Sequence, residues 1–244
     1  MTAPALSTRA RRVLDEAQLA EGTTIVVACS GGIDSQTLLD VLAHVVLRDR
    51  RRGLCLHAHA VDHGLRASAV EEIELARVLA SARGVPFTTE RLEVAAGGNL
   101  QARARDARWR SLRRLAASFG AGTRIATGHH RDDRAETVLI KLLRGGPLDA
   151  FAVLPAVEGD RLRPLIEASR VEVTAHAARR ALDFARDPSN DDPRFLRSRV
   201  RHELLPLLES LDPAVRDHLT ALAAEACART GPTSARSRSK RGRT

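Results

Sequence analysis

Aromatic side chains are scarce in this chain of 244 residues, which has one Trp, five Phe and no Tyr. Proteins that bind RNA by stacking unpaired bases need several aromatic rings on one face, so the composition excludes that mode of RNA recognition. The three cysteines, Cys29, Cys55 and Cys227, are far apart and form no C-x-x-C pair. Their spacing therefore argues against a disulfide scaffold and against a cysteine-bound metal cluster.

Long hydrophobic runs are also lacking. No segment approaches the roughly 18 consecutive apolar residues of a membrane-spanning helix. Residues 1–12 contain no apolar stretch of the kind found in signal peptides. We therefore expect a cytoplasmic protein that does not associate with membranes.

The charge of the chain is positive and unevenly distributed. The formal net charge is +9, from 39 basic and 30 acidic residues. Residues 229–244 carry no acid, and their basic residues are Arg229, Arg236, Arg238, Lys240, Arg241 and Arg243. We expect this segment to be a disordered, solvated tail. It either attracts phosphate backbones without regard to sequence, or is an overhang without a role.

Strand-like and helix-like segments alternate along the chain. Short apolar runs rich in β-branched residues indicate buried strands, and apolar residues at three- and four-residue spacing indicate helices. The expected strands are 23–29, 54–61, 85–92, 123–127 and 162–165. The expected helices are 6–17, 34–48, 69–83, 99–119, 132–143, 169–182, 194–209 and 213–228.

This alternation predicts an α/β fold. We expect a doubly wound, mostly parallel, Rossmann-like sheet of five strands with helices on both faces. Residues 1–150 would form the nucleotide-binding domain, and residues 151–228 would add the final strand and a small C-terminal helical appendage. Ligands of such sheets bind at the carboxyl ends of the strands, which is where functional residues are expected.

The turn after the first strand reads SGGIDS, residues 30–35, and leads into a helix. Backbone N–H groups and the positive end of the helix meet there and favour a bound anion. The turn lacks the spacing and the Lys of a Walker A loop. Asp34 would repel phosphates unless a divalent cation lay between them, so the turn predicts a nucleotide bound with Mg²⁺.

A cluster of carboxylates follows the fourth expected strand, in the segment 127–137 that reads TGHHRDDRAET. On a helix, Asp132 and Asp133 lie four and three residues before Glu136, and like charges at this spacing destabilise the helix. The helix N-terminus offsets part of this repulsion, and a bound cation could offset the rest. A cation site and a merely dipole-complementing helix start both remain open.

A zinc site is a weaker interpretation. Adjacent histidines point in different directions, and no H-E-x-x-H spacing is present. The histidines that such a site would use are His129 and His130 with His57, His59 or His63.

The hexapeptide SGGIDS resembles the SGGxDS loop of the N-type ATP pyrophosphatases, which cleave ATP between its α and β phosphates and adenylate an oxygen atom. Further segments narrow the resemblance: VDHGLR at 61–66, NLQARAR at 99–105, RPL at 163–165 and DPSNDDPRFLRSRVRHELLP at 187–206. In this order and spacing, residues 23–208 resemble the tRNA(Ile)-lysidine synthetases. The fold implied is that of the adenine nucleotide α-hydrolases.

The resemblance implies a ligase that forms a C–N bond. Members of the family use ATP to adenylate the C2 oxygen of the wobble cytidine in the CAU anticodon of tRNA(Ile). The amine of free L-lysine then displaces AMP, giving lysidine and changing the codon that is read from AUG to AUA. ATP and Mg²⁺ are the implied cofactors, and tRNA(Ile) and L-lysine the implied partners. The oligomeric state stays open, with a homodimer as one option.

The resemblance also implies roles for individual residues. The residues expected to bind ATP are Ser30, Gly31, Gly32, Ile33, Asp34, Ser35 and His63. Asp34 and Asp133 would hold the metal, and Glu136 would join them in managing Mg²⁺ or the lysine ammonium. Arg197 and Arg201 would face substrate phosphates. The six arginines within residues 101–114 could contact tRNA phosphates as well, although a chain with only two lysines uses arginine in every basic role.

Two features depart from the family pattern. Ser198 stands where the family usually has Asn, and nothing folded is expected beyond about residue 228, where most members continue into tRNA-binding domains. Three explanations of the short length stay open. The catalytic part and the basic tail could be enough for tRNA binding, the selection of RNA could be looser, or the chain could be a truncated form. The alternatives to lysidine formation are tRNA thiolation, amide formation by a related adenylating enzyme, and a non-catalytic nucleotide- or RNA-binding module.

Overall fold

The structure is a computed structural model that describes residues 5–48, 53–62, 69–92, 100–185 and 192–230. By compactness the chain divides into two units, each made from two stretches of sequence. Unit 1 comprises Met1–Gly128 and Ala156–Arg186, and unit 2 comprises His129–Pro155 and Asp187–Thr244. The sequence analysis expected a single domain boundary near residue 150, whereas the division by compactness assigns residues 129–155 to unit 2 and 156–186 to unit 1.

Unit 1 contains one sheet with the strand order β3-β2-β1-β4-β6-β5. The strands are β1 (Thr24–Cys29), β2 (Cys55–Asp62), β3 (Phe87–Arg91), β4 (Arg124–Ala126), β5 (Val157–Glu158) and β6 (Arg161–Leu162). All neighbours are parallel except β5 and β6, which pair antiparallel. The mostly parallel sheet is confirmed, but the number of five strands was wrong. The strand that was not predicted is β5, which has two residues, too few to leave an apolar pattern in the sequence.

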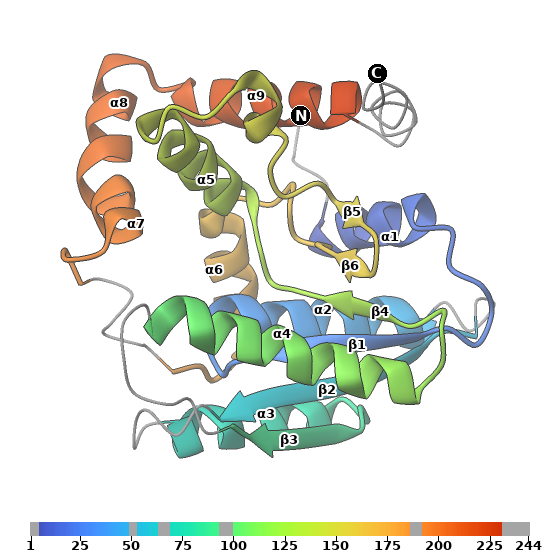
Figure 1. The fold of residues 1–244 in the computed structure, drawn as a ribbon. Coiled ribbons are helices and arrows are strands. Elements are labelled where there is room, and N and C mark those ends of the chain that lie inside the picture. The colour runs from blue at the N-terminus through green and yellow to red at the C-terminus, as the bar shows by residue number, and fades with distance from the viewer. Residues whose placement is uncertain (1–4, 49–52, 63–68, 93–99, 186–191, 231–244) are drawn as a thin grey trace. The chain divides into compact units, whose positions relative to one another are not determined.

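Helices cover both faces of this sheet. In Figure 1, α4 lies in front of the strands and α2 and α3 lie behind them. The helices of unit 1 are α1 (Leu6–Glu16), α2 (Ile33–Arg48), α3 (Ala69–Ala82), α4 (Leu100–Ser118) and α6 (Arg170–Arg179). Side chains of β1 alternate between the faces: Ile25 and Val27 join the core that contains α2, and Val26 packs with Leu112 of α4. Both faces of β1 are therefore buried, as its continuous apolar run predicted.

The strand order reverses beside β1. From β1 the chain proceeds through β2 to β3, then returns by α4 to β4 on the other side of β1. β2 lies on one side of β1 and β4 on the other, and in doubly wound folds such a switch point, at the carboxyl ends of the strands, is where ligands bind. The glycine turn at residues 30–35 lies at this point.

Unit 2 is helical in the part that the structure describes. Its elements are α5 (Arg131–Leu143), the 3₁₀ helix η2 (Leu148–Phe151), α7 (Leu196–Arg199), the π-helical turn η4 (Val200–Leu204), α8 (Leu205–Leu211) and α9 (Val215–Thr230). The single helix predicted over 194–209 is a run from 196 to 211 with a π turn in its middle. The helix predicted over 213–228 extends to Thr230, so the first two residues of the expected tail are helical. Residues 231–244 lie outside the described residues.

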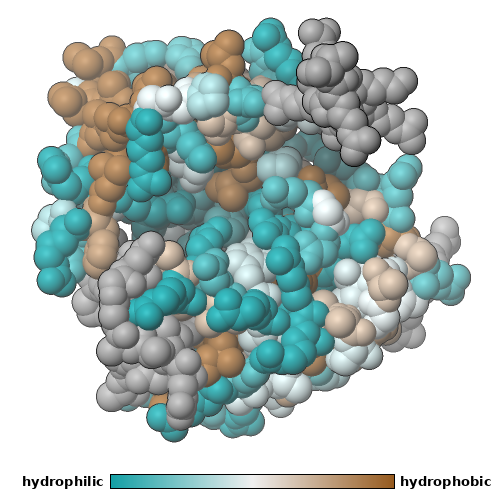
Figure 2. Space-filling model, viewed as in Figure 1, coloured by the Kyte–Doolittle hydropathy of each residue, from teal (hydrophilic) through white to brown (hydrophobic). Residues whose placement is uncertain are grey.

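The surface of unit 2 is partly apolar. Figure 2 shows brown, hydrophobic surface over α8, where the side chains of Leu207 and Leu211 are exposed. None of the helices within the described ranges combines the length and hydrophobicity that crossing a bilayer requires.

Candidate active site

The glycine turn joins β1 to α2 and is held by its own serines. The Ser35 hydroxyl donates to the Gly32 carbonyl at 2.9 Å and accepts from the Ser30 backbone N–H at 3.1 Å. The Ser30 hydroxyl also donates to Ser35 Oγ, at 3.3 Å. Because Ser35 is buried, these bonds hold the Ser30 N–H and the Gly32 carbonyl in place without the help of a ligand.

The two glycines of the turn serve different purposes. Gly31 has a φ of +71°, and a Cβ there would lie 2.2 Å from the carbonyl oxygen of Glu72 in α3, so no other residue fits. At Gly32 the nearest atom to an added Cβ would be Ser30 Oγ, 3.7 Å away. As far as the described residues go, the space beside Gly32 is thus open, which suits the close approach of a phosphate group.

Gly128 brings the chain after β4 against the same turn. A Cβ on Gly128 would lie 2.9 Å from the carbonyl carbon and oxygen of Asp34 and 3.2 Å from the Ser35 nitrogen. The glycine in the TGHH segment is therefore required by contact with the first turn of α2, a reason that the sequence did not reveal.

Asp34 lies in the first turn of α2, at the positive end of the helix dipole. The first N–H groups of a helix have no acceptors within the helix, so they can bind an anion. Across the described stretches, no three His, Cys, Asp or Glu side chains gather in a way that would hold a metal ion. Mg²⁺ commonly uses one or two carboxylates and completes its shell with phosphate and water, and Asp34 beside an anion site suits that requirement.

In unit 2, two buried carboxylates of α5 pair with two arginines. Asp133 and Glu136 are 8% and 1% exposed. Arg197 donates to Glu136 Oε2 at 2.8 Å and to Asp133 Oδ1 at 2.9 Å. Arg201 donates to Glu136 Oε1 at 2.6 Å and to Oε2 at 3.1 Å. The structure thus brings together four of the residues expected to be catalytic. The two arginines neutralise carboxylates that would otherwise repel each other on α5.

The ionisation of Asp133 follows from this arrangement. Burial alone would raise the pKa of Asp133, but the neighbouring His130, Arg197 and His129 and the hydrogen bond from the His130 backbone N–H lower it to about 2. Asp133 is therefore an anion at neutral pH. The Arg197 side chain is 41% exposed, so part of its guanidinium is accessible beyond the carboxylates.

Arg216 is a further member of the cluster that the sequence did not indicate. It donates to Asp132 Oδ1 at 2.6 Å and to Glu209 Oε2 at 3.0 Å. Arg216 belongs to α9, far along the chain from Asp132, and no local pattern links the two. Asp132 is thereby engaged in a structural ion pair between α5 and α9.

Arg108 is a second residue that the sequence did not distinguish from its neighbours. It lies on the side of α4 that carries the buried residues Ala107, Ser111 and Leu112. It forms no hydrogen bond or ion pair with the described residues. Burial, and then the charge of Arg105, lower the pKa of Arg108. An anion beside Arg108 would therefore stabilise unit 1.

Two further expectations concern residues outside the buried cluster. His63, expected to bind ATP, lies outside the described residues. The helix expected to begin at residue 194 begins at Leu196 instead, so Arg194 precedes α7 and pairs with Asp192 at 2.6 Å.

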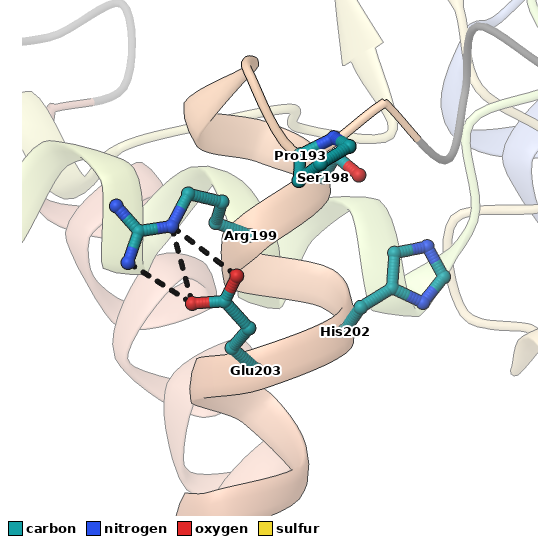
Figure 3. Close-up of a pocket in the computed structure, with 5 residues that line it drawn as sticks. All are labelled: Pro193, Ser198, Arg199, His202 and Glu203. Atoms are coloured by element: carbon teal, nitrogen blue, oxygen red, sulfur yellow. Dashed lines mark hydrogen bonds and ion pairs between the residues drawn. The ribbon is translucent and has the colours of Figure 1, made fainter.

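A shallow hollow of about 260 Å³ lies in unit 2 beside α7 and the π turn (Figure 3). Ser198, the departure from the family pattern, is buried at its wall. The lining residues are Pro193, Ser198, Arg199, His202 and Glu203. Arg199 Nη2 is paired with Glu203 Oε2 at 3.0 Å, so its charge is already satisfied.

Comparison with known proteins adds independent findings. The family model described as PP-loop domain matches residues 4–208. The tRNA(Ile)-lysidine synthase of Pseudomonas aeruginosa is 42% identical over 189 residues, which are 75% of this chain and 41% of that protein. The tRNA(Ile)-lysidine synthase of Thermobifida fusca is 38% identical over 216 residues, 87% of this chain and 64% of that protein. The chain spans less than half the length of the first of these relatives.

A solved structure has the same fold. The U34-tRNA thiolase of Methanococcus maripaludis, solved with its 4Fe-4S cluster, superposes with a TM-score of 0.75 at 19% identity. The match covers 91% of this chain and 77% of the thiolase. At this identity the likeness shows a common fold.

Proposed function

Because this chain belongs to the PP-loop domain family, we propose that it is the catalytic part of a tRNA(Ile)-lysidine synthase. It would adenylate the wobble cytidine of tRNA(Ile) with a CAU anticodon, in the cytoplasm, and join free L-lysine to that base. Curated relatives of this name, 36–42% identical, support the proposal. The observation that carries it is the serine-fixed glycine turn at the switch point of the sheet.

The turn in unit 1 would bind the pyrophosphate end of ATP. The open side of Gly32 admits phosphate oxygens, and the N–H groups at the start of α2 stabilise the negative charge that grows on the leaving pyrophosphate. ATP supplies the adenylyl group, and Mg²⁺ held by Asp34 would neutralise phosphate charge. Since the serines already hold both ends of the turn, less conformational entropy is lost when the nucleotide binds.

The cluster in unit 2 would handle the charged ends of the substrates. Asp133 remains ionised and would attract the lysine ammonium or a metal ion. Arg197 and Arg201 hold Asp133 and Glu136 in place, and the exposed part of Arg197 could contact a phosphate or the lysine carboxylate. Positioning and electrostatic stabilisation of this kind supply most of the catalysis in phosphoryl and adenylyl transfer.

Arg108 would contact an anionic group of a substrate in unit 1. Its guanidinium lies on the core-facing side of α4 and has no carboxylate partner among the described residues. A planar guanidinium binds phosphate in a two-pronged manner. A phosphate of the nucleotide or of the tRNA is therefore the ligand class that Arg108 suits.

The main competing activity is thiolation of tRNA by a related enzyme. Such an enzyme uses reactive or cluster-binding cysteines, and this chain has three that are far apart. Burial raises the pKa of the Cys29 thiol, at the end of β1, to about 12, so it is not a thiolate at neutral pH. These features favour lysine ligation over sulfur transfer.

The proposal is tested by incubating the protein with ATP, Mg²⁺, radiolabelled L-lysine and tRNA(Ile) bearing the CAU anticodon. We expect label in the tRNA, with one AMP and one pyrophosphate released for each lysine. A tRNA(Ile) with uridine in place of the wobble cytidine serves as the control and should remain unlabelled. Production of ADP alone, or labelling of both tRNAs, would contradict the proposal.

A further inference from the structure

A short segment after α6 runs along the glycine turn inside unit 1. This segment, Leu182–Ala185, is called the strap below. The Ala185 backbone N–H donates to the Gly31 carbonyl at 2.9 Å, and Ala185 forms an isolated parallel β-bridge with Gly32. Gln36 Nε2 in α2 donates to the Asp183 carbonyl at 3.0 Å. Two hydrogen bonds therefore join the strap to the turn and to the helix that follows it.

The bond from Ala185 determines which way the Gly31–Gly32 peptide faces. In a trans peptide the C=O and N–H bonds point in opposite directions. With the Gly31 carbonyl held toward the strap, the Gly32 N–H points away from it. If the strap were absent this peptide could rotate, because glycines on both sides impose little steric restriction. The strap thus removes the main conformational freedom of the turn.

The strap is itself held in register from two sides. Gln36 is 1% exposed, so its side chain has little room to move. Upstream, His176 and Arg180 bind Asp40 of α2 at 2.8 and 3.1 Å, and Asp40 is 1% exposed. Hence α6, which leads into the strap, is fixed to the helix that begins at the glycine turn. A shift of Gln36 would be passed directly to the peptide that faces the ligand.

We propose that Gln36 is a positioning residue that, through the strap, sets the Gly32 N–H for binding pyrophosphate. The proposal rests on the proposed ATP site at residues 30–35 and goes beyond it, because it assigns to a buried side chain outside the turn the control of affinity at the turn. Gln36 does not touch the ligand. Its loss should weaken binding of pyrophosphate and ATP and leave the affinity for lysine unchanged.

The test compares Gln36→Met, which keeps the side-chain volume but cannot donate, with Thr37→Val in the full-length protein. Thr37 is the adjacent residue, fully buried, and its hydroxyl has no hydrogen-bond partner in the described part of the chain. Binding of Mg²⁺–pyrophosphate is measured by calorimetry. We expect Gln36→Met to bind roughly tenfold more weakly, about 1.4 kcal/mol, and Thr37→Val to bind like the wild type. The KM for ATP should rise in Gln36→Met, and the KM for lysine should not.

A second variant keeps the test valid if Gln36→Met folds poorly. Gln36→Glu can donate to the Asp183 carbonyl only when its carboxyl is protonated, so its pyrophosphate affinity should recover toward the wild-type value as the pH falls from 8 to 6. Two results would overturn this inference and leave the proposed function standing. The first is equal affinities for Gln36→Met, Thr37→Val and the wild type, and the second is a Gln36→Glu affinity that equals that of the wild type at every pH. A wild-type protein that binds neither ATP nor pyrophosphate would overturn the proposed function as well.

Discussion

At the scale of single residues, the sequence indicated the candidate site residues but not their partners. The order of SGGIDS and the spacing of Asp133 and Glu136 could be interpreted because both patterns are local. The pairing of Glu136 with Arg197 and Arg201 could not be predicted, because the two arginines follow Glu136 by 61 and 65 positions in sequence. Arg108 was one of six similar arginines until the packing of α4 showed that it faces the buried side.

Glu136 provides a test of the buried cluster. Glu136→Gln removes the negative charge that faces Arg197 and Arg201, and breaking a buried pair in this way costs about 3 kcal/mol of unfolding free energy. Glu203→Gln is the matched control, because Glu203 pairs with Arg199 at the surface, where ion pairs contribute at most about 1 kcal/mol. Chemical denaturation of both variants measures the difference. Equal losses of stability would contradict the assignment of Glu136 to a buried ion-pair network.

In contrast to Glu136, replacing Arg108 should raise the stability of the protein and lower its activity. Arg108→Met removes a partly buried charge that has no partner among the described residues, so we expect the unliganded protein to become more stable, by about 1 kcal/mol. Lysine incorporation should fall at least tenfold, because an anionic group of a substrate loses its contact. Arg113→Met is the control, since Arg113 is exposed and paired with Asp160. An Arg108→Met protein that is less stable and fully active would show that Arg108 has a structural role.

At the scale of elements, the positions of helices and strands were predictable, and the exceptions have physical reasons. The buried strand β1 and the helices of unit 1 follow from their apolar patterns, and their ends agree with the predicted ends within three residues. The π turn at Val200–Leu204 was missed because it does not interrupt the helical spacing of apolar residues enough to be seen. The strap was missed because its role depends on backbone hydrogen bonds to a distant turn.

The junction of α1 and α6 supports a pH prediction. Hydrogen bonds from Arg9 lower the pKa of Glu172 to about 2, against the opposing effect of burial, and Arg9 Nη2 lies 2.7 Å from Glu172 Oε1. A depressed carboxyl pKa adds stability that is complete above about pH 4.5 and is lost as the pH falls toward 2. We expect Glu172→Gln to reduce the unfolding free energy at pH 7 by roughly 2 kcal/mol.

The measurement is the unfolding free energy of the wild type and of Glu172→Gln between pH 7 and pH 2. The two curves should converge as the pH falls below 4.5. Curves that remain parallel over this range would mean that Glu172 does not titrate as the ion pair with Arg9 requires.

At the scale of the whole molecule, the fold class could be predicted but the division into two units could not. Composition and alternation revealed the sheet, whereas the insertion of residues 156–186 into unit 1 depends on β6 pairing with β4. The net charge of +9 suits a polyanionic substrate. Under the proposed function, affinity for tRNA would depend on the basic residues of this chain.

The basic residues after Thr230 allow a test of this dependence. Removing residues 231–244 deletes five basic side chains and no acidic one. If these charges contact phosphates, tRNA affinity should fall and the slope of log affinity against log salt should become shallower by up to about 4. Filter binding over a range of salt concentrations measures the slope. An unchanged slope would mean that the segment makes no phosphate contacts.

The central claim is that the glycine turn with Asp34 captures pyrophosphate while a base of tRNA(Ile) is adenylated. The most direct measurement is the exchange of radiolabelled pyrophosphate into ATP, without lysine, in the presence and absence of tRNA(Ile). We predict exchange that requires the tRNA and falls at least about 100-fold in Asp34→Asn, because the electrostatic stabilisation at the leaving group is lost. Exchange that does not require tRNA, or that proceeds at the wild-type rate in Asp34→Asn, would contradict this account.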